Sequence, residues 1–272
     1  MPFSVLMSLY IKENPDYLRQ SLDSVFNQTL PPDEVILVED GPLTEDLYSV
    51  LDIYEQKYPQ FKRVRIPVNG GLGKALNEGL KHCSNELVAR MDTDDVCFHD
   101  RFEKQIDYMN SHPEIAVSSG WIEEFENDID NVRSVKRVPE TPDEVKRYGV
   151  KRCPLNHPAV ILRKSVVESV GGYIHFPLFE DWYLWARLMS HGYKLGNIQA
   201  PVLYFRVSPE MYRRRGGLKY AKDSFRFQRK LKELGLISGF QVVKYGVIRG
   251  LVYMMPNFMR RFVYRNFLRR QH

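Results

Sequence analysis

Three carboxylates within four positions, Asp92, Asp94 and Asp95, follow the apolar run 87–91 in this chain of 272 residues. The run has the composition of a buried strand, so the acids fall where that strand would leave a core. Negative charges this close repel one another, and a divalent cation or a phosphate-bearing ligand would relieve the repulsion. The alternative is a solvated acidic turn that caps the following helix, and the three residues alone leave both interpretations open.

Two further motifs would lie beside this turn if strands and helices alternate. The apolar run 34–38 ends in Glu39, Asp40 and Gly41, which makes a second acidic strand end. Residues 69–79 form a glycine-rich loop that runs into a helix, and such loops let backbone amides approach an anion. The loop is neither a P-loop nor a dinucleotide-binding fingerprint, so a tight strand-to-helix turn explains it equally well.

The second half of the chain supplies another pair of acids and a histidine. Glu180 and Asp181 begin an aromatic helix, where an acid often serves only as a cap. Partial burial beside Phe179 and Trp182 would raise a carboxyl pKa toward the working range of a base. His157 precedes a proline, which holds it in extended geometry, and it either contacts a ligand or is a satisfied structural histidine.

The elements that must position these motifs alternate regularly over the first third. Strands are expected at 3–9, 34–38, 63–68, 86–91, 115–120, 159–162, 194–198 and 202–205, with a hairpin in the polar segment 121–140. Helices are expected after Asn14, Thr44 and the glycine-rich loop, at 101–110 and 142–151, and from 180 to Gly192. This order predicts an α/β fold with a mostly parallel sheet and helices on both faces. Ligands of such sheets bind beyond the carboxyl ends of the strands, where both acidic strand ends and the glycine-rich loop would meet.

Composition narrows the class of protein. The three cysteines, Cys83, Cys97 and Cys153, share no metal-ligand or redox spacing, which suits a reducing compartment. The N-terminus begins directly with a strand-like run and lacks a basic leader, so no signal peptide is expected. No apolar run is long enough to span a bilayer.

Charge is distributed unevenly along the chain. Residues 206–272 hold 17 Lys or Arg against 3 Asp or Glu, which gives a charge of +14. Residues 1–205 hold the remaining 22 Lys or Arg and 31 Asp or Glu, which gives a charge of −9. A basic helix over 211–234 and alternating apolar and basic residues from 240 onward predict amphipathic helices that bind an anionic membrane surface. The alternative is that these helices pack on the body with a solvated basic face. Nucleic acid is a weaker candidate because no nucleic-acid module is present.

Together the motifs resemble family 2 glycosyltransferases with the GT-A fold, of the type that builds bacterial surface polysaccharides. The resemblance rests on Glu39-Asp40-Gly41, Asn69-Gly70-Gly71 with Asn77 and Gly79, Asp92-x-Asp94-Asp95 and Glu180-Asp181-x-x-Leu184. It implies a catalytic domain over 1–206, with a nucleotide-binding half at 1–95 and an acceptor half at 96–206. A basic amphipathic helical extension over 207–272 would follow.

The resemblance also implies roles for individual residues. Asp40 would bind a uracil-type base, Asp92 would approach the ribose or sugar, and Asp94 would hold Mn²⁺ or Mg²⁺ on the diphosphate. Asp181 would be the catalytic base. The nucleotide-sugar site would comprise Leu9, Glu39, Asp40, Asn69, Gly71, Lys74, Asn77, Arg90, Asp92 and Thr93. Contacts with the acceptor or diphosphate would come from His157, Glu180, Trp182 and Arg206.

The expected reaction is inverting transfer of a hexose or N-acetylhexosamine from a UDP-sugar to a lipid-linked saccharide at the cytoplasmic face of the membrane. The absence of Gln-x-x-Arg-Trp, which is typical of processive members, predicts one sugar per binding event. A sugar-1-phosphate nucleotidyltransferase is a rival, but its glycine-rich, arginine-containing start is missing after 3–9. A non-catalytic sugar-nucleotide-binding or membrane-docking scaffold is another rival, against which the intact acids argue.

Overall fold

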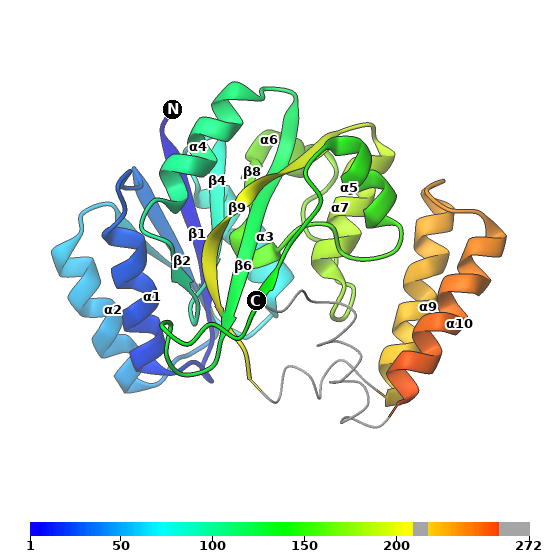
Figure 1. Cartoon of the computed structure of the whole chain (residues 1–272). Helices are drawn as coiled ribbons and strands as arrows, with labels where there is room; N and C mark the ends of the chain where they lie inside the picture. Colours follow the sequence, from blue (N-terminus) through cyan, green and yellow to red (C-terminus); the bar gives the residue numbers. More distant parts are fainter. Residues whose placement is uncertain (209–216, 256–272) are drawn as a thin grey trace.

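A single mixed sheet carries the site, in the strand order β3-β2-β1-β4-β8-β6-β9-β5 with β7 paired to β6 (Figure 1). The computed structural model describes residues 1–208 and 217–255. The strands are β1 Phe3–Leu9, β2 Glu34–Asp40, β3 Phe61–Ile66, β4 Leu87–Asp92, β5 Val96–Cys97, β6 Ile115–Phe125, β7 Ser134–Lys136, β8 Ile161–Arg163 and β9 Lys194–Arg206. The helices are α1 Pro15–Phe26, α2 Glu45–Lys57, α3 Leu72–His82, α4 Arg101–Ser111, α5 Pro142–Gly149, α6 Lys164–Ser169, α7 Glu180–Ser190, α9 Gly217–Glu233 and α10 Gly239–Met254.

The first four strands form the expected parallel half. β1 pairs with β2 and with β4, and β2 pairs with β3, all in parallel. The carboxyl ends of β2 and β4 therefore lie on the same edge, on either side of β1. This arrangement confirms the predicted sheet edge, because it brings the acidic end of β2 near the acidic end of β4.

Helices cover both faces of the sheet because successive side chains of each buried strand point to opposite sides. Val5 and Met7 of β1 pack in a core with α1, α2 and α4, whereas Leu6 packs in a second core with α3 and α7. The helix starts follow the capping signals: the Asn14 side chain accepts a hydrogen bond from the Asp16 amide at 2.8 Å. The α/β fold with helices on both faces is confirmed.

The second half departs from simple alternation. β8 is antiparallel to both β4 and β6, and β6 runs parallel to β9. The two strands expected at 194–198 and 202–205 form the single strand β9, because register shifts opposite Trp121 accommodate Pro201 within the ladder. The strand expected at 159–162 begins only at Ile161, after a 3₁₀ turn at His157–Ala159. The hairpin expected within 121–140 is present as β6 and β7.

The last two described helices pack on α7 (Figure 1). Phe227 of α9 contacts Phe179 and Trp182, with ring centroids 5.1 and 4.6 Å apart. Positions 211–216 of the expected helix 211–234, and all of 256–272, lie outside the described residues. Within the described ranges, none of the helices combines the length and apolar character that crossing a bilayer requires.

Candidate active site

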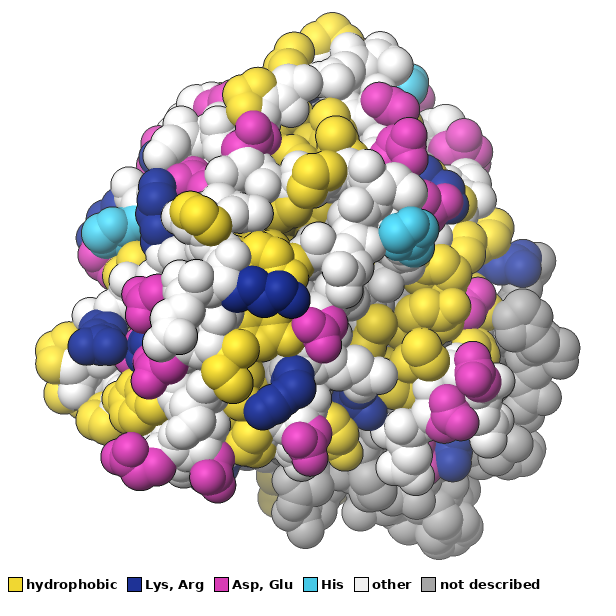
Figure 2. All heavy atoms as spheres, turned by 90° about the vertical axis from the view of Figure 1, so that its left-hand side faces the viewer, with side chains coloured by type: hydrophobic (Ala, Val, Ile, Leu, Met, Phe, Trp, Pro, Cys, Tyr) yellow, Lys and Arg dark blue, Asp and Glu magenta, His cyan; other side chains and the backbone are white. Residues whose placement is uncertain are grey.

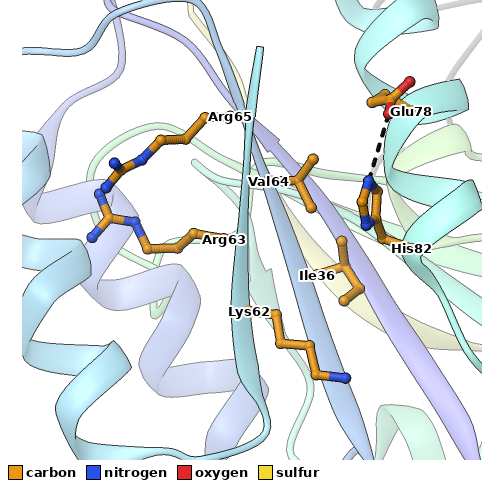
Figure 3. Close-up of a pocket in the computed structure, with 7 residues that line it drawn as sticks. All are labelled: Ile36, Lys62, Arg63, Val64, Arg65, Glu78 and His82. Atoms are coloured by element: carbon orange, nitrogen blue, oxygen red, sulfur yellow. Dashed lines mark ion pairs between the residues drawn. The ribbon is translucent and has the colours of Figure 1, made fainter.

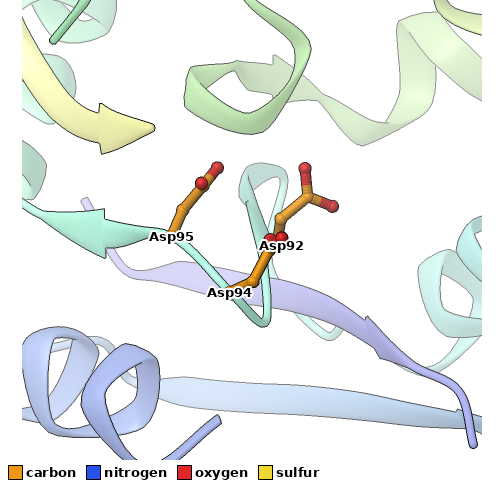
Figure 4. A group of neighbouring side chains, drawn as sticks. All are labelled: Asp92, Asp94 and Asp95. Carbon is orange, nitrogen blue, oxygen red and sulfur yellow. The ribbon is translucent and has the colours of Figure 1, made fainter. Parts of the chain in front are cut away.

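The acidic turn follows β4 directly, and its three carboxylates gather around one turn of backbone (Figure 4). Asp92, Asp94 and Asp95 each offer an oxygen within 4.8 Å of the others'. Asp95 is fully buried, and its Oδ1 accepts a hydrogen bond from the Arg206 amide at 2.8 Å. Its Oδ2 is buried with no hydrogen-bond partner among the described residues. An unpaired oxygen in this position suits a site completed by a cation.

Arg206 stabilises the acidic turn through hydrogen bonds. Its Nε donates to the Asp94 carbonyl at 2.8 Å, and its NH2 group donates to Gln20 Oε1 at 2.5 Å. The guanidinium also lies between the rings of Tyr17 and Phe125, at 3.8 and 4.4 Å from their centroids. The structure thus gives this buried arginine partners within the protein, in place of the expected contact with acceptor or diphosphate.

Glu13 is a fourth carboxylate at the turn, and the motif pattern did not identify it. Its Oε2 accepts a hydrogen bond from Thr93 Oγ1 at 2.7 Å. Burial raises the pKa of Glu13, and the nearby Asp92 charge raises it further. The signal that points to Glu13 is its place in the loop after β1, which ends at the same sheet edge as β4. Thr93 is buried, and its hydroxyl joins the acidic turn to Glu13.

The electrostatics of the turn favour a bound cation. Burial raises the pKa of Asp94 to about 7, and the charges of Asp92 and Glu13 contribute. Burial, followed by the charges of Asp94 and Asp92, raises the pKa of Asp95 well above its usual range. Carboxylates that resist ionisation next to one another are stabilised in the charged form by a divalent ion, and oxygen ligands suit Mn²⁺ and Mg²⁺. The residues present therefore fit the expected metal.

Cation affinity should depend on pH through Asp94, because this carboxyl must lose its proton to act as a ligand. With a pKa of about 7, we expect Mn²⁺ affinity to fall roughly tenfold per pH unit below neutrality. The pKa of Asp94 in the folded state lies above the ordinary value of 3.8. Without metal, the free energy of unfolding should therefore decrease as the pH rises from this ordinary value to about 7. Calorimetric Mn²⁺ titration, and denaturant melts with and without Mn²⁺, would measure both effects. A pH-independent affinity would contradict the assignment.

Arg90 sets the direction of Asp92. The two side chains share one face of β4, and the buried guanidinium binds both carboxylate oxygens of Asp92, with NH1 at 2.9 Å from Oδ2. The Asp92 side chain remains 31% exposed, so it can still reach a ligand. Arg90 was expected to contact the nucleotide sugar, and the structure gives it Asp92 as its partner.

Asp40 closes the glycine-rich loop. Its two carboxylate oxygens accept hydrogen bonds from the amides of Gly70 and Gly71, at 2.7 and 3.0 Å. Asn69 Nδ2 donates to the Asp40 carbonyl at 3.0 Å. Gly71 has a φ of +86°, which favours glycine, and Lys74 stands exposed in the next turn. Two amides of the loop thus bind a carboxylate of the protein itself, and the binding of a ligand anion by this loop stays a prediction.

Glu39 and Leu9 face away from this loop. The buried Glu39 carboxylate pairs with Arg63 at 2.6 Å and with Arg65 at 3.3 Å. The Leu9 side chain is wholly buried in the core, which leaves only its main chain for a ligand. Both were expected in the nucleotide-sugar site, and the structure places their side chains in the protein interior.

Asn77 and His157 both bond to Tyr173, and the Asn77 bonds join the nucleotide-binding half (1–95) to the acceptor half (96–206). Both polar atoms of the Asn77 side chain bond to the Tyr173 main chain at 2.7 Å. The phenol of Tyr173 lies 3.0 Å from His157 Nε2. Burial, with the Arg90 charge adding, lowers the pKa of His157 well below its usual range, so its ring is neutral. The structure therefore shows these side chains as links between α3 and the turn before α7.

The first turn of α7 presents the two expected acids. Asp181 Oδ2 lies 3.4 Å from Cys153 Sγ. Glu180 lies beside α3, where a Cβ built on Gly73 would be 3.7 Å from its Cγ, and burial raises the pKa of Glu180. Trp182 was expected near the acceptor, but it is 5% exposed, donates to the Gly149 carbonyl and packs against Phe227. It faces away from the site because α9 supplies its apolar partner.

A separate hollow of about 510 Å³ lies at the outer edge of the sheet, between β3 and α3 (Figure 3). Glu78 and His82 form an ion pair on one side, at 3.5 Å. None of the expected site residues lines it. Its walls are Ile36, Lys62, Arg63, Val64, Arg65, Glu78 and His82.

Parallel strands ending in paired acids, a glycine-rich loop at the same edge and a second acidic helix start define a GT-A type glycosyltransferase. Residues 4–170 match the model of the family described as Glycosyl transferase family 2. The chain belongs to this family, and it is a glycosyltransferase.

Relatives and solved structures agree with this assignment. The chain is 40% identical to the "Amylovoran biosynthesis glycosyltransferase AmsE" of Erwinia amylovora, over 96% of this chain and 97% of the relative. It is 37% identical, over 98% and 97%, to the Escherichia coli "UDP-Gal:alpha-D-GlcNAc-diphosphoundecaprenol beta-1,3-galactosyltransferase". The solved structure of S. aureus TarS 1–349 in complex with UDP-GlcNAc superposes with a TM-score of 0.70 at 17% identity, covering 97% of this chain and 75% of TarS 1–349. This last likeness concerns the fold.

Proposed function

We propose that this enzyme transfers a hexose or N-acetylhexosamine from a UDP-sugar to a lipid-linked saccharide during synthesis of a bacterial surface polysaccharide. The observation that carries the proposal is the acidic turn Asp92–Asp95, which shares one sheet edge with Asp40 and the glycine-rich loop. The Escherichia coli relative, whose name gives UDP-Gal as donor and a diphosphoundecaprenol-linked GlcNAc as acceptor, supports both substrate classes.

In this proposal the donor lies along the sheet edge. Asp40 binds the uracil, which requires that its carboxylate exchange a glycine amide for the base. Asp92, aimed by Arg90, contacts the ribose or the sugar. Asp94 would hold Mn²⁺ or Mg²⁺, with Asp95 and Glu13 close by, and the ion would supply positive charge to balance the charge that develops on the leaving UDP. Arg206 keeps the turn in place for all three acids.

The acceptor hydroxyl needs a base, and we assign Asp181 to that role. A carboxylate at the half-buried first turn of α7 can accept the hydroxyl proton as the oxygen attacks the anomeric carbon. One carboxylate suffices for a single displacement, which inverts the anomeric centre, whereas a covalent route needs a nucleophile on the opposite sugar face. One sugar is then added per binding event.

The lipid on the acceptor places the reaction at a membrane. We propose that the enzyme is peripheral, at the inner face of the cytoplasmic membrane, where its basic C-terminal helices meet anionic lipid. The catalytic half would then reach an acceptor head group without entering the bilayer.

The proposal is tested by incubating the purified chain with Mn²⁺, a GlcNAc-diphospho-lipid and, in parallel, UDP-galactose, UDP-glucose or UDP-N-acetylglucosamine. We expect UDP release and a disaccharide whose new linkage, determined by NMR, has the configuration opposite to that of the donor. Absence of UDP release with every donor would favour a binding scaffold. Pyrophosphate release from UTP and a sugar-1-phosphate would favour a nucleotidyltransferase.

A further inference from the structure

The outward face of α10 is apolar. Phe240, Val243, Val247, Ile248 and Met254 are 77, 58, 56, 51 and 55% exposed. Their spacing places them on one side of the helix. The opposite side packs on the body through other residues of α10, so this exposed stripe is not the contact that holds the helix in place.

The inner side of α10 is tied to the body. Val242 and Tyr253 are buried with α7 and α9 residues. Arg249 lies over the Trp182 ring at 4.5 Å and donates to the Lys151 carbonyl. These contacts leave the stripe on the outside of the molecule, which agrees with the outer position of α10 in Figure 1.

A row of cations borders the stripe. α10 contains no Asp or Glu, and among the acids of α9 Asp223 is buried, which leaves Glu233. The two helices pack side by side, since a Cβ on Gly246 would meet the Phe225 ring and one on Gly239 would lie 3.6 Å from Lys232 Nζ. The exposed cations of α9 are Lys219, Lys222, Arg226, Arg229 and Lys232.

We infer that this outer face of α9 and α10 docks on an anionic lipid bilayer, with α10 lying in the interface plane. An apolar stripe with cations beside it is the pattern of interfacial helices. The stripe from Phe240 to Met254 is about 21 Å long at 1.5 Å per residue, too short to span a bilayer but suited to lying on one. A second copy of the chain fits less well, because its own cations would face these.

The opposite end of the molecule lacks this pattern. On the face on the left of Figure 1, acidic, basic and hydrophobic side chains are interspersed (Figure 2). Docking by α10 therefore gives the enzyme a defined orientation. Because Phe227 packs against Phe179 and Trp182, the docked hairpin contacts the first turn of α7, which carries Asp181. The inference specifies the face through which the membrane association of the proposed function would occur, and the use of this orientation to meet a lipid-linked acceptor rests on that function.

The test is co-sedimentation of the full chain with phosphatidylglycerol-containing vesicles and with phosphatidylcholine vesicles. We expect Val247→Asp to weaken binding to the anionic vesicles about tenfold or more, because it places a charge within the stripe. Ile53→Asp on α2 is the matched control, since Ile53 is 55% exposed and Val247 56%, and it should bind as wild type. A triple exchange of Lys222, Arg226 and Arg229 to Glu should abolish the preference for phosphatidylglycerol.

Sedimentation of Val247→Asp at the wild-type level would overturn the inference. So would a shift of wild type, but not of this variant, to a dimer in gel filtration without lipid, because the stripe would then bind a second copy. Release of UDP from a water-soluble donor in the absence of vesicles should be the same in wild type and Val247→Asp. If the wild-type enzyme releases no UDP, that result would count against the proposed function and leave the docking result unaffected.

Discussion

Asp94→Asn should lower sugar transfer about 10³-fold and remove its dependence on Mn²⁺. The change keeps the size of the side chain but removes the charge that we assign to the metal ion. An ion that stabilises transition-state charge contributes several kcal/mol, and about 4 kcal/mol corresponds to this loss. Steady-state transfer measured across a Mn²⁺ titration gives the result directly.

The matched control is Asp107→Asn, which removes a carboxylate from the exposed side of α4. It should transfer sugar at the wild-type rate with the wild-type Mn²⁺ requirement. If Asp94→Asn retains the wild-type transfer rate and the wild-type Mn²⁺ requirement, the ion is held elsewhere. The acidic turn would then be a structural feature at the end of β4.

Asp181→Asn should reduce transfer by about 10²–10⁴-fold while UDP binding stays unchanged, because the amide cannot accept the acceptor's proton. Calorimetric UDP binding and transfer kinetics on the same sample separate the two effects. The hydrogen-bond partner of the Asp181 side chain is Cys153, and Asn gives the same side-chain size, so we expect the exchange to leave the fold of the site intact.

Glu180→Gln serves as the comparison, since the two acids are neighbours and burial raises the pKa of Glu180. A smaller loss in Glu180→Gln than in Asp181→Asn supports the assignment. A larger loss would transfer the role of base to Glu180.

Much of the fold was predictable because local patterns sufficed. Apolar runs of strand length alternate with capped helices through residue 92, and parallel strands leave few ways to order them. The meeting of Asp40 with the glycine-rich loop followed from the same reasoning, because β2 and β3, the strands that precede them, are adjacent and parallel. The metal, base and ligand roles of individual residues stay predictions.

The remaining features depend on contacts between distant parts of the chain. Arg206 bonds to Gln20, 186 positions away, and no local pattern indicates that partner. Trp182 adjoins two acids in sequence, yet its direction is decided by Phe227 of α9. Two strands were expected at 194–198 and 202–205, whereas register shifts around Pro201 keep β9 continuous. In each case tertiary packing overrides what neighbouring residues favour.

The bonds from Arg206 to the acidic turn have a consequence for how the enzyme is made. Asp95 accepts a hydrogen bond from the main-chain amide of Arg206, which lies 111 positions later at the end of β9. A nascent chain that has released residues 1–95 from the ribosome contains every expected nucleotide contact, but it lacks the group that fixes the turn. We therefore expect competence for donor binding to arise late in translation, once β9 has emerged and Arg206 can bond to the turn.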